Sequence, residues 1–134
     1  MSRPLFLFEM KLKGLGVDIF EKKRMKAALA KTSAGLFLKK VFLQGEIRAY
    51  SGERGGYIKY SVMFALKEAV LKALGMGWNA YANFCDIRVE FEGKTANIHL
   101  SGKTAKLAKK KGVKKIISDY SVSPRHVVAV AALV

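Results

Sequence analysis

The sequence predicts an α+β fold: a single compact domain over residues 1–134, with a mainly antiparallel sheet and helices packed on one face. Three observations support this prediction. Apolar and charged residues alternate over residues 86–100, as in a strand pair with one wet face. A clean apolar stripe at helical spacing runs over residues 59–74. The chain has only two prolines, one near each end, and 134 residues are enough to bury one hydrophobic core.

The N-terminal part predicts a strand followed by a basic helix. Apolar residues alternate with charged ones in residues 5–13, which favours a strand. A Gly-Leu-Gly segment ends this strand. Asp18 and Glu21 then have the spacing of a capping box, so a helix is predicted from about Ile19 to Lys31.

The middle of the chain contains one ambiguous segment. Residues 36–50 fit a helical stripe and also a strand alternation, and periodicity alone does not decide between them. A bent continuation of the preceding helix is favoured. Residues 51–56, which read Ser-Gly-Glu-Arg-Gly-Gly, predict a loop before the helix at 59–74.

The second half predicts a hairpin, a helix and a last strand. Residues 86–92 and 95–100 alternate on both sides of a Gly-Lys turn and predict an antiparallel hairpin. Lysine-rich residues 103–120 predict a helix that is interrupted at Gly112. Residues 126–134 are apolar on both faces and predict a strand that is covered on both sides, by the sheet or by a partner.

Charge is the most unusual property of the chain. There are 25 Lys and Arg against 10 Asp and Glu, a net charge of +15, and most of the basic residues are lysines. Such a charge favours a polyanionic partner, although it also keeps an apolar protein soluble. Lysine contacts phosphate as a point charge, without reading base sequence.

The predicted function is therefore non-enzymatic binding of nucleic acid, DNA or RNA, without sequence specificity. The strongest signal is a run of seven lysines with no acid among them, whose repulsion a polyanion would relieve; a solvated surface is the alternative. The predicted phosphate contacts are Lys22, Lys23, Lys26, Arg54, Lys103, Lys106, Lys109, Lys110, Lys111, Lys114 and Lys115. Trp78 and Tyr81 are candidates for base stacking, or else for a lid on the core.

No enzymatic activity, metal site or cofactor is predicted. His99 and His126 lack metal-ligand spacing to each other and to Cys85, and the cysteine stands in no nucleophile motif. A single cysteine also excludes an intrachain disulfide. No secretory signal is visible and no apolar run is long enough to span a bilayer, so a cytoplasmic protein without a membrane partner is expected.

A second hypothesis is a structural subunit of a viral or phage particle, or of a similar assembly. The segments Lys13-Gly14-Leu15 and Arg54-Gly55-Gly56-Tyr57 flank the predicted basic helix. This layout resembles that of small basic phage neck or tail-completion proteins, over at most the first half of the chain. The resemblance implies a virion-associated capsid, neck or tail-completion component. The basic faces and the last strand would then form contacts in a homo-oligomer or larger assembly.

Overall fold

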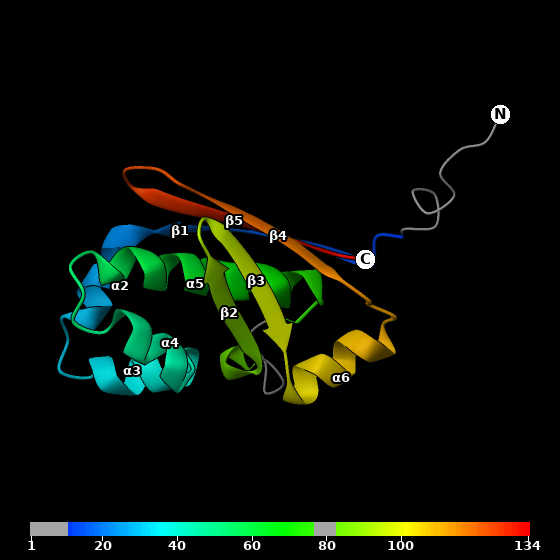
Figure 1. Cartoon of the computed structure of the whole chain (residues 1–134), viewed down its shortest axis with the longest axis horizontal. Helices are drawn as coiled ribbons and strands as arrows, with labels where there is room; N and C mark the ends of the chain where they lie inside the picture. The colour runs from blue at the N-terminus through cyan, green and yellow to red at the C-terminus, as the bar shows by residue number, and fades with distance from the viewer. Residues whose placement is uncertain (1–10, 77–82) are drawn as a thin grey trace.

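The computed structural model describes residues 11–76 and 83–134, and Figure 1 shows their arrangement. The predicted α+β class is confirmed. The elements are β1 (Gly14–Glu21), α2 (Lys22–Leu29), α3 (Ala34–Val41), α4 (Gln44–Tyr50), α5 (Gly56–Ala73), the 3-10 helix η1 (Phe84–Asp86), β2 (Ile87–Glu92), β3 (Thr95–Leu100), α6 (Gly102–Lys110), β4 (Ile116–Val122) and β5 (His126–Leu133).

The strands form two antiparallel sheets. The larger sheet has the order β1-β5-β4, and β1 pairs with β5 from Gly14 opposite Leu133 to Glu21 opposite His126. The second sheet is the predicted hairpin, β2 with β3. In Figure 1 the larger sheet lies along α5, with α3 and α4 on the other side of that helix.

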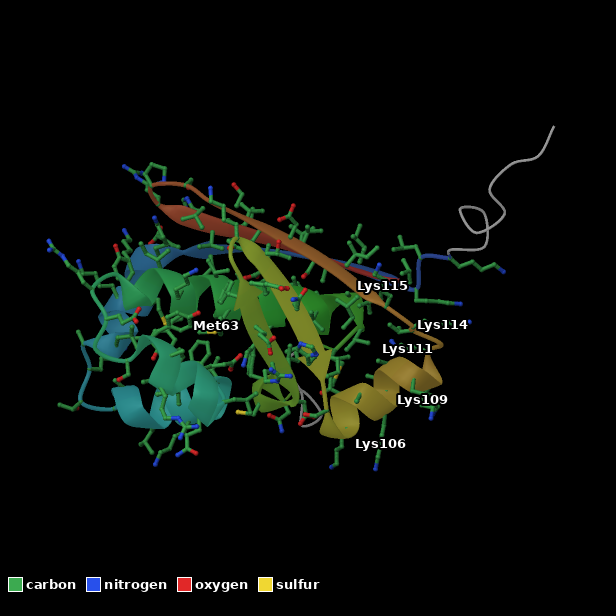
Figure 2. All side chains as sticks on the ribbon, in the orientation of Figure 1. Met63, Lys106, Lys109, Lys111, Lys114 and Lys115 are labelled. Atoms are coloured by element: carbon green, nitrogen blue, oxygen red, sulfur yellow. The ribbon has the colours of Figure 1, made fainter. Side chains whose placement is uncertain are left out.

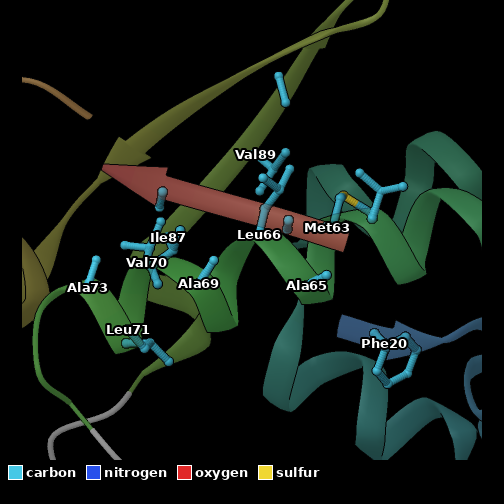
Figure 3. Packing of buried hydrophobic residues seen from close by; sticks show 14 of the residues in the cluster. Phe20, Met63, Ala65, Leu66, Ala69, Val70, Leu71, Ala73, Ile87 and Val89 are labelled. Carbon is cyan, nitrogen blue, oxygen red and sulfur yellow. The ribbon is translucent and has the colours of Figure 1, made fainter. Parts of the chain in front are cut away.

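Helix α5 is the centre of the hydrophobic core. The prediction of a helix over residues 59–74 is confirmed, and α5 extends it by one turn at its start. Apolar residues occur almost all around α5, as is typical of a helix that is buried on every side. Figure 3 shows Leu66, Ala69 and Val70 of this helix packed with Ile87 and Val89 of β2. The inner face of β5 is fully buried against the same helix.

The predicted start of the first helix is wrong. Residues 1–10, which hold most of the expected first strand, lie outside the described residues. Asp18 does not cap a helix but lies within β1, and α2 begins only at Lys22. Glycine usually interrupts a strand, but in β1 two glycines alternate with exposed apolar residues and face α5.

Two other predictions of secondary structure are corrected or refined. The helix predicted over residues 103–120 is wrong in its second half, where residues 116–122 form β4. Gly112 has a φ of 78°, a left-handed conformation that ends helices, and the following Ile, Ser and Tyr residues alternate inward. The favoured helical interpretation of residues 36–50 is confirmed, as α3 and α4 with a break at Phe42 and Leu43.

The outer face of the larger sheet is apolar and exposed. It carries Leu15, Val17 and Ile19 of β1, Val128 of β5 and Ile117 of β4, each at least 40% exposed. Helix α5 thus covers the inner face of the last strand, whereas a cover for its outer face, such as a second copy of the chain, remains a prediction. Over residues 11–76 and 83–134, no helix combines the length and apolar character needed to cross a membrane.

Candidate functional site

Two acidic side chains lie near each other where β1 crosses α5. Asp18 points inward from β1, and its side chain is only 13% exposed. Glu68 and Lys72 come from consecutive turns of α5 and so lie on one face of that helix. The Nζ of Lys72 donates to Asp18 Oδ1 at 2.9 Å and to the backbone oxygen of Val17 at 3.1 Å. The result is a carboxylate pair with one ammonium group.

Electrostatics mark this group as a candidate site. Burial raises the pKa of Glu68 above its ordinary value, and the nearby charge of Asp18 raises it further, while Lys72 opposes both effects. A half-buried carboxylate next to a second one costs folding stability, because burial removes water from its charge and the two charges repel each other. Arrangements of this kind are concentrated at functional sites.

Glycines in β1 allow the strand to approach α5 closely enough for this contact. A Cβ on Gly16 would lie 1.9 Å from the backbone oxygen of Ala69, and a Cβ on Gly14 would lie 2.0 Å from that of Ala73. A side chain at either position would therefore overlap the helix backbone. This close approach places the next inward residue, Asp18, opposite the exposed edge of α5.

A pocket of about 700 Å³ is lined in part by neighbours of Asp18 and Glu68 in β1 and α5. Phe20 follows Asp18 by two residues on the same face of β1, Phe64 precedes Glu68 by one helical turn, and both line the pocket. The Phe20 and Phe64 rings lie 4.9 Å apart, and Phe64 stacks on Phe84 at 5.6 Å. Among the residues that the structure describes, the cations around this apolar pocket are Arg24, Lys31 and Lys40, and no acidic residue lines it. We call it the basic-rimmed pocket.

A second, smaller pocket lies on the other side of α2. Its volume is about 430 Å³, and its lining includes Arg125 and three of the predicted phosphate contacts, Lys22, Lys23 and Lys26. The Nζ of Lys26 lies 5.4 Å from the centre of the Tyr57 ring. The structure therefore brings these three lysines together, next to the end of β1.

The other predicted contacts lie away from the acidic pair. Arg54 is exposed in the turn between α4 and α5. The remaining lysines are exposed along α6 and the segment that leads to β4, and Figure 2 shows several of them at the end of the molecule opposite α2 and α3. This group is Lys103, Lys106, Lys109, Lys110, Lys111, Lys114 and Lys115. One of them has a structural role, because the Nζ of Lys111 donates to the backbone oxygen of Leu74 at the end of α5.

Two further predictions concern aromatic residues and metals. Trp78 and Tyr81, the candidates for base stacking, lie outside the described residues. Within the part of the chain that is described, no group of three or more His, Cys, Asp or Glu side chains is placed to hold a metal ion. A site that holds a cation would thus need ligands from a substrate as well as from the protein.

Sequence reasoning missed the acidic pair and its lysine. The local pattern predicts Asp18 as part of a capping box, and it leaves Glu68 and Lys72 off the apolar stripe of the helix at 59–74. One signal was present: Lys67, Glu68 and Lys72 interrupt a helix that is otherwise almost wholly apolar. Charged residues in such a helix need a partner or a function, because burying an unpaired charge is costly.

Comparisons with known proteins identify the family of the chain. The model of the 4′-phosphopantetheinyl transferase superfamily matches residues 14–131. The chain is 33% identical over 125 residues to a holo-[acyl-carrier-protein] synthase of Streptomyces avermitilis, and the match covers 93% of this chain and 96% of that protein.

Solved structures give the same result. The holo-ACP-synthase of Plasmodium yoelii superposes with a TM-score of 0.77 at 28% identity, over 92% of this chain and 94% of that one. The synthase of Helicobacter pylori, a structure in complex with coenzyme A, superposes with a TM-score of 0.74 over 90% and 99% of the two chains; at 24% identity it supports the fold alone.

These matches correct the functional predictions. The matching family consists of transferases and the relative is an enzyme, so the predictions of a nucleic-acid-binding protein and of no enzymatic activity are wrong. The alternative of a viral or phage subunit is wrong for the same reason. The relative is named for its action on acyl carrier protein, and the Helicobacter pylori structure holds coenzyme A. A net charge of +15 fits any polyanion, and so it could not identify the partner.

Proposed function

Because the chain belongs to the 4′-phosphopantetheinyl transferase superfamily, we propose that it is a holo-[acyl-carrier-protein] synthase. In this reaction a hydroxyl group of the carrier protein attacks the phosphorus of the phosphopantetheine moiety of coenzyme A. A phosphodiester bond forms, the pyrophosphate bond breaks, and adenosine 3′,5′-bisphosphate leaves. The observation that carries the proposal is the nearby carboxylates of Asp18 and Glu68, with Lys72 bonded to Asp18, and a basic-rimmed apolar pocket lined by their neighbours in β1 and α5.

The charges of this group suit phosphoryl transfer. Lys72 presents an ammonium group that can balance negative charge on the phosphate oxygens, and Asp18 holds it in place. Asp18 and Glu68 also fit a magnesium ion, because Mg²⁺ is typically bound by one or two carboxylates together with substrate phosphates. Such an ion would neutralise the charge of the pyrophosphate, and it would relieve the repulsion between the two carboxylates.

The first experiment tests the reaction directly. The purified protein, coenzyme A and Mg²⁺ are incubated with a panel of apo acyl carrier proteins, and each carrier is weighed by mass spectrometry. We expect a mass gain of one 4′-phosphopantetheine group, lost when EDTA is added and restored by excess Mg²⁺. The proposal fails if a known synthase modifies the panel and this protein modifies none of it.

The basic-rimmed pocket is the surface to which we expect the carrier protein to bind. Its apolar floor and its three cations, with no acidic side chain among the described lining residues, complement a partner that presents apolar and acidic side chains together. The cytoplasmic location expected from the sequence also remains a prediction of this proposal.

Charge reversal on this rim should weaken the carrier interaction. Arg24→Glu and Lys40→Glu are expected to raise the KM for the carrier about tenfold each, because rim charges steer the encounter. The KM for coenzyme A should change less. The control is Lys106→Glu, which makes the same charge change on α6, away from both pockets. Equal effects of all three variants would mean that only net charge matters, and that the rim is not the carrier surface.

A further inference from the structure

A buried ion pair lies on the opposite side of α5 from Lys72 and Asp18. Lys67 precedes Glu68 in the chain, but its side chain points toward α3, α4 and η1. Its Nζ lies 2.7 Å from Oε1 of Glu46, and the two side chains are 0% and 5% exposed. Nothing in the proposed transfer reaction uses this pair.

Every hydrogen of the Lys67 ammonium group has an acceptor. Besides Glu46, the Nζ donates to the backbone oxygen of Val41 at 2.8 Å and to that of Phe84 at 3.2 Å. Val41 is the last residue of α3, and Phe84 is the first residue of η1. One side chain of α5 therefore binds the ends of two segments that are far apart in the sequence.

Glu46 is bound as completely as its partner. Its Oε1 accepts from the backbone N–H of Leu43 at 2.8 Å, and its Oε2 accepts from that of Val89 in β2 at 2.9 Å. Together the two side chains satisfy four backbone groups. An apolar pair of similar volume would leave these groups buried and unpaired, which is costly. The pair thus does more than fill space: it holds particular backbone atoms in place.

The two carbonyl groups that Lys67 binds belong to one wall of the basic-rimmed pocket, because Val41 and Phe84 both line that pocket. We propose that Lys67 and Glu46 are positioning residues, which hold this wall, formed by α3 and η1, in the shape that receives the carrier protein. The proposal rests on the function proposed above. It assigns to the pair no contact with the reacting atoms.

Cys85 provides a reporter of this wall that does not depend on activity. Its Sγ lies 3.5 Å from the backbone oxygen of Lys39, 3.6 Å from that of Lys40 and 3.8 Å from that of Phe42, so it sits between η1 and the end of α3. It is also the only cysteine of the chain. Separation of α3 from η1 would expose this thiol.

The charge of Lys67 makes the direction of the test unambiguous. Burial raises the pKa of Cys85, and the Lys67 charge lowers it. Removing that charge would therefore make the reactive thiolate rarer and labelling slower. Faster labelling in a Lys67 variant can come only from greater exposure of the thiol.

The experiment compares Lys67→Met and Glu46→Gln with the parent protein. The control is Lys59→Met, which makes the same change two turns earlier in α5, where the Nζ lies 4.3 Å from the centre of the Phe91 ring. The rate of Cys85 labelling by a thiol reagent is measured well below each Tm, together with kcat and the KM for the carrier. In both pair variants Cys85 should react about tenfold faster than in the parent. Their KM for the carrier should be about tenfold higher, while kcat stays within about twofold of the parent value. The control should match the parent in all three measurements.

Three results would overturn the proposal. The first is an unchanged rate of labelling, and the second is faster labelling with an unchanged KM for the carrier. The third is a lower kcat with an unchanged KM, because this is the effect of a smaller fraction of folded protein. Should Lys67→Met fail to fold, Glu46→Gln decides, because it keeps the shape and one acceptor oxygen of the side chain. The charge of Glu46 raises the pKa of Cys85, so the labelling of this variant is measured over a series of pH values and compared as the rate of the fully ionised thiolate. If the parent transfers nothing, the proposed function fails separately, and unchanged labelling still shows that the pair does not hold this wall.

Discussion

Glu68→Gln is expected to lower transfer about a hundredfold or more, because it removes one of the two carboxylates that would hold the magnesium ion in the proposed reaction. The same variant should be more stable than the parent at neutral pH and without divalent cations. Burial and the charge of Asp18 both disfavour the ionised form of Glu68 in the folded protein. The amide keeps the shape of the side chain without this cost. A gain in stability with a loss of activity is typical of a site shaped for function.

The pH dependence of the stability effect follows from the raised pKa of Glu68. As pH rises past the ordinary pKa of Glu, the unfolded chain releases its proton first, and the folded state loses stability until the raised pKa is passed. At more acidic pH both states are protonated, and the variant should match the parent. Thermal unfolding in EDTA at a series of pH values measures this difference.

Glu53→Gln is the matched control for this prediction, because Glu53 is exposed in the turn before α5. It should change neither the transfer rate nor the pH dependence of Tm. If Glu68→Gln transfers as fast as the parent, Glu68 has no role in the reaction. If the variant is less stable than the parent at neutral pH, the ionised carboxylate stabilises the folded state, contrary to this prediction.

The elements that the sequence predicts well are those whose pattern is decided locally. The hairpin of β2 and β3 alternates between a buried and an exposed face, and the apolar residues of α5 recur at helical spacing within a segment too long for a strand. The last strand is apolar on both faces because one face packs on α5 and the other belongs to the exposed apolar surface. In each case the residues that decide the structure lie within the element itself.

The errors occur where a distant element decides the structure. Gly14 and Gly16 look like strand breakers, but their lack of a side chain is what the neighbouring helix requires. The β4 segment follows a lysine-rich helix, and its pairing with β5 decides its conformation. The run of lysines attracted a functional interpretation because repulsion is visible in the sequence, whereas exposure to solvent is not.

The acidic pair was beyond sequence reasoning for a similar reason. Asp18 and Glu68 are far apart in the chain, and each has an ordinary local explanation, as a helix cap and as a polar edge. They meet only because β1 packs along α5 at close range. The geometry of the site thus depends on the contact between these two backbones, and a single methyl group can test it.

Gly16→Ala is expected to damage both the fold and the transfer reaction. The new Cβ would lie 1.9 Å from the oxygen of Ala69 and 2.7 Å from the nitrogen of Ala73. Both are backbone atoms, so no side-chain rotation can relieve the overlap. On its other side β1 is paired with β5, where Gly16 faces Ala131. The strand must therefore shift away from the helix, at a cost of about 1–3 kcal/mol for overpacking.

The shift also moves Asp18, which lies two residues further along the same face. A displacement of about 1 Å can cost on the order of a hundredfold in rate, so the transfer rate of the folded variant should fall by about that factor. The control is Gly45→Ala in α4, where a Cβ meets nothing within 4 Å and should add about 0.5–1 kcal/mol of stability. Urea unfolding and transfer rates measure both effects. A Gly16→Ala protein with the parent's stability and rate would show that the contact between β1 and α5 does not set the position of Asp18.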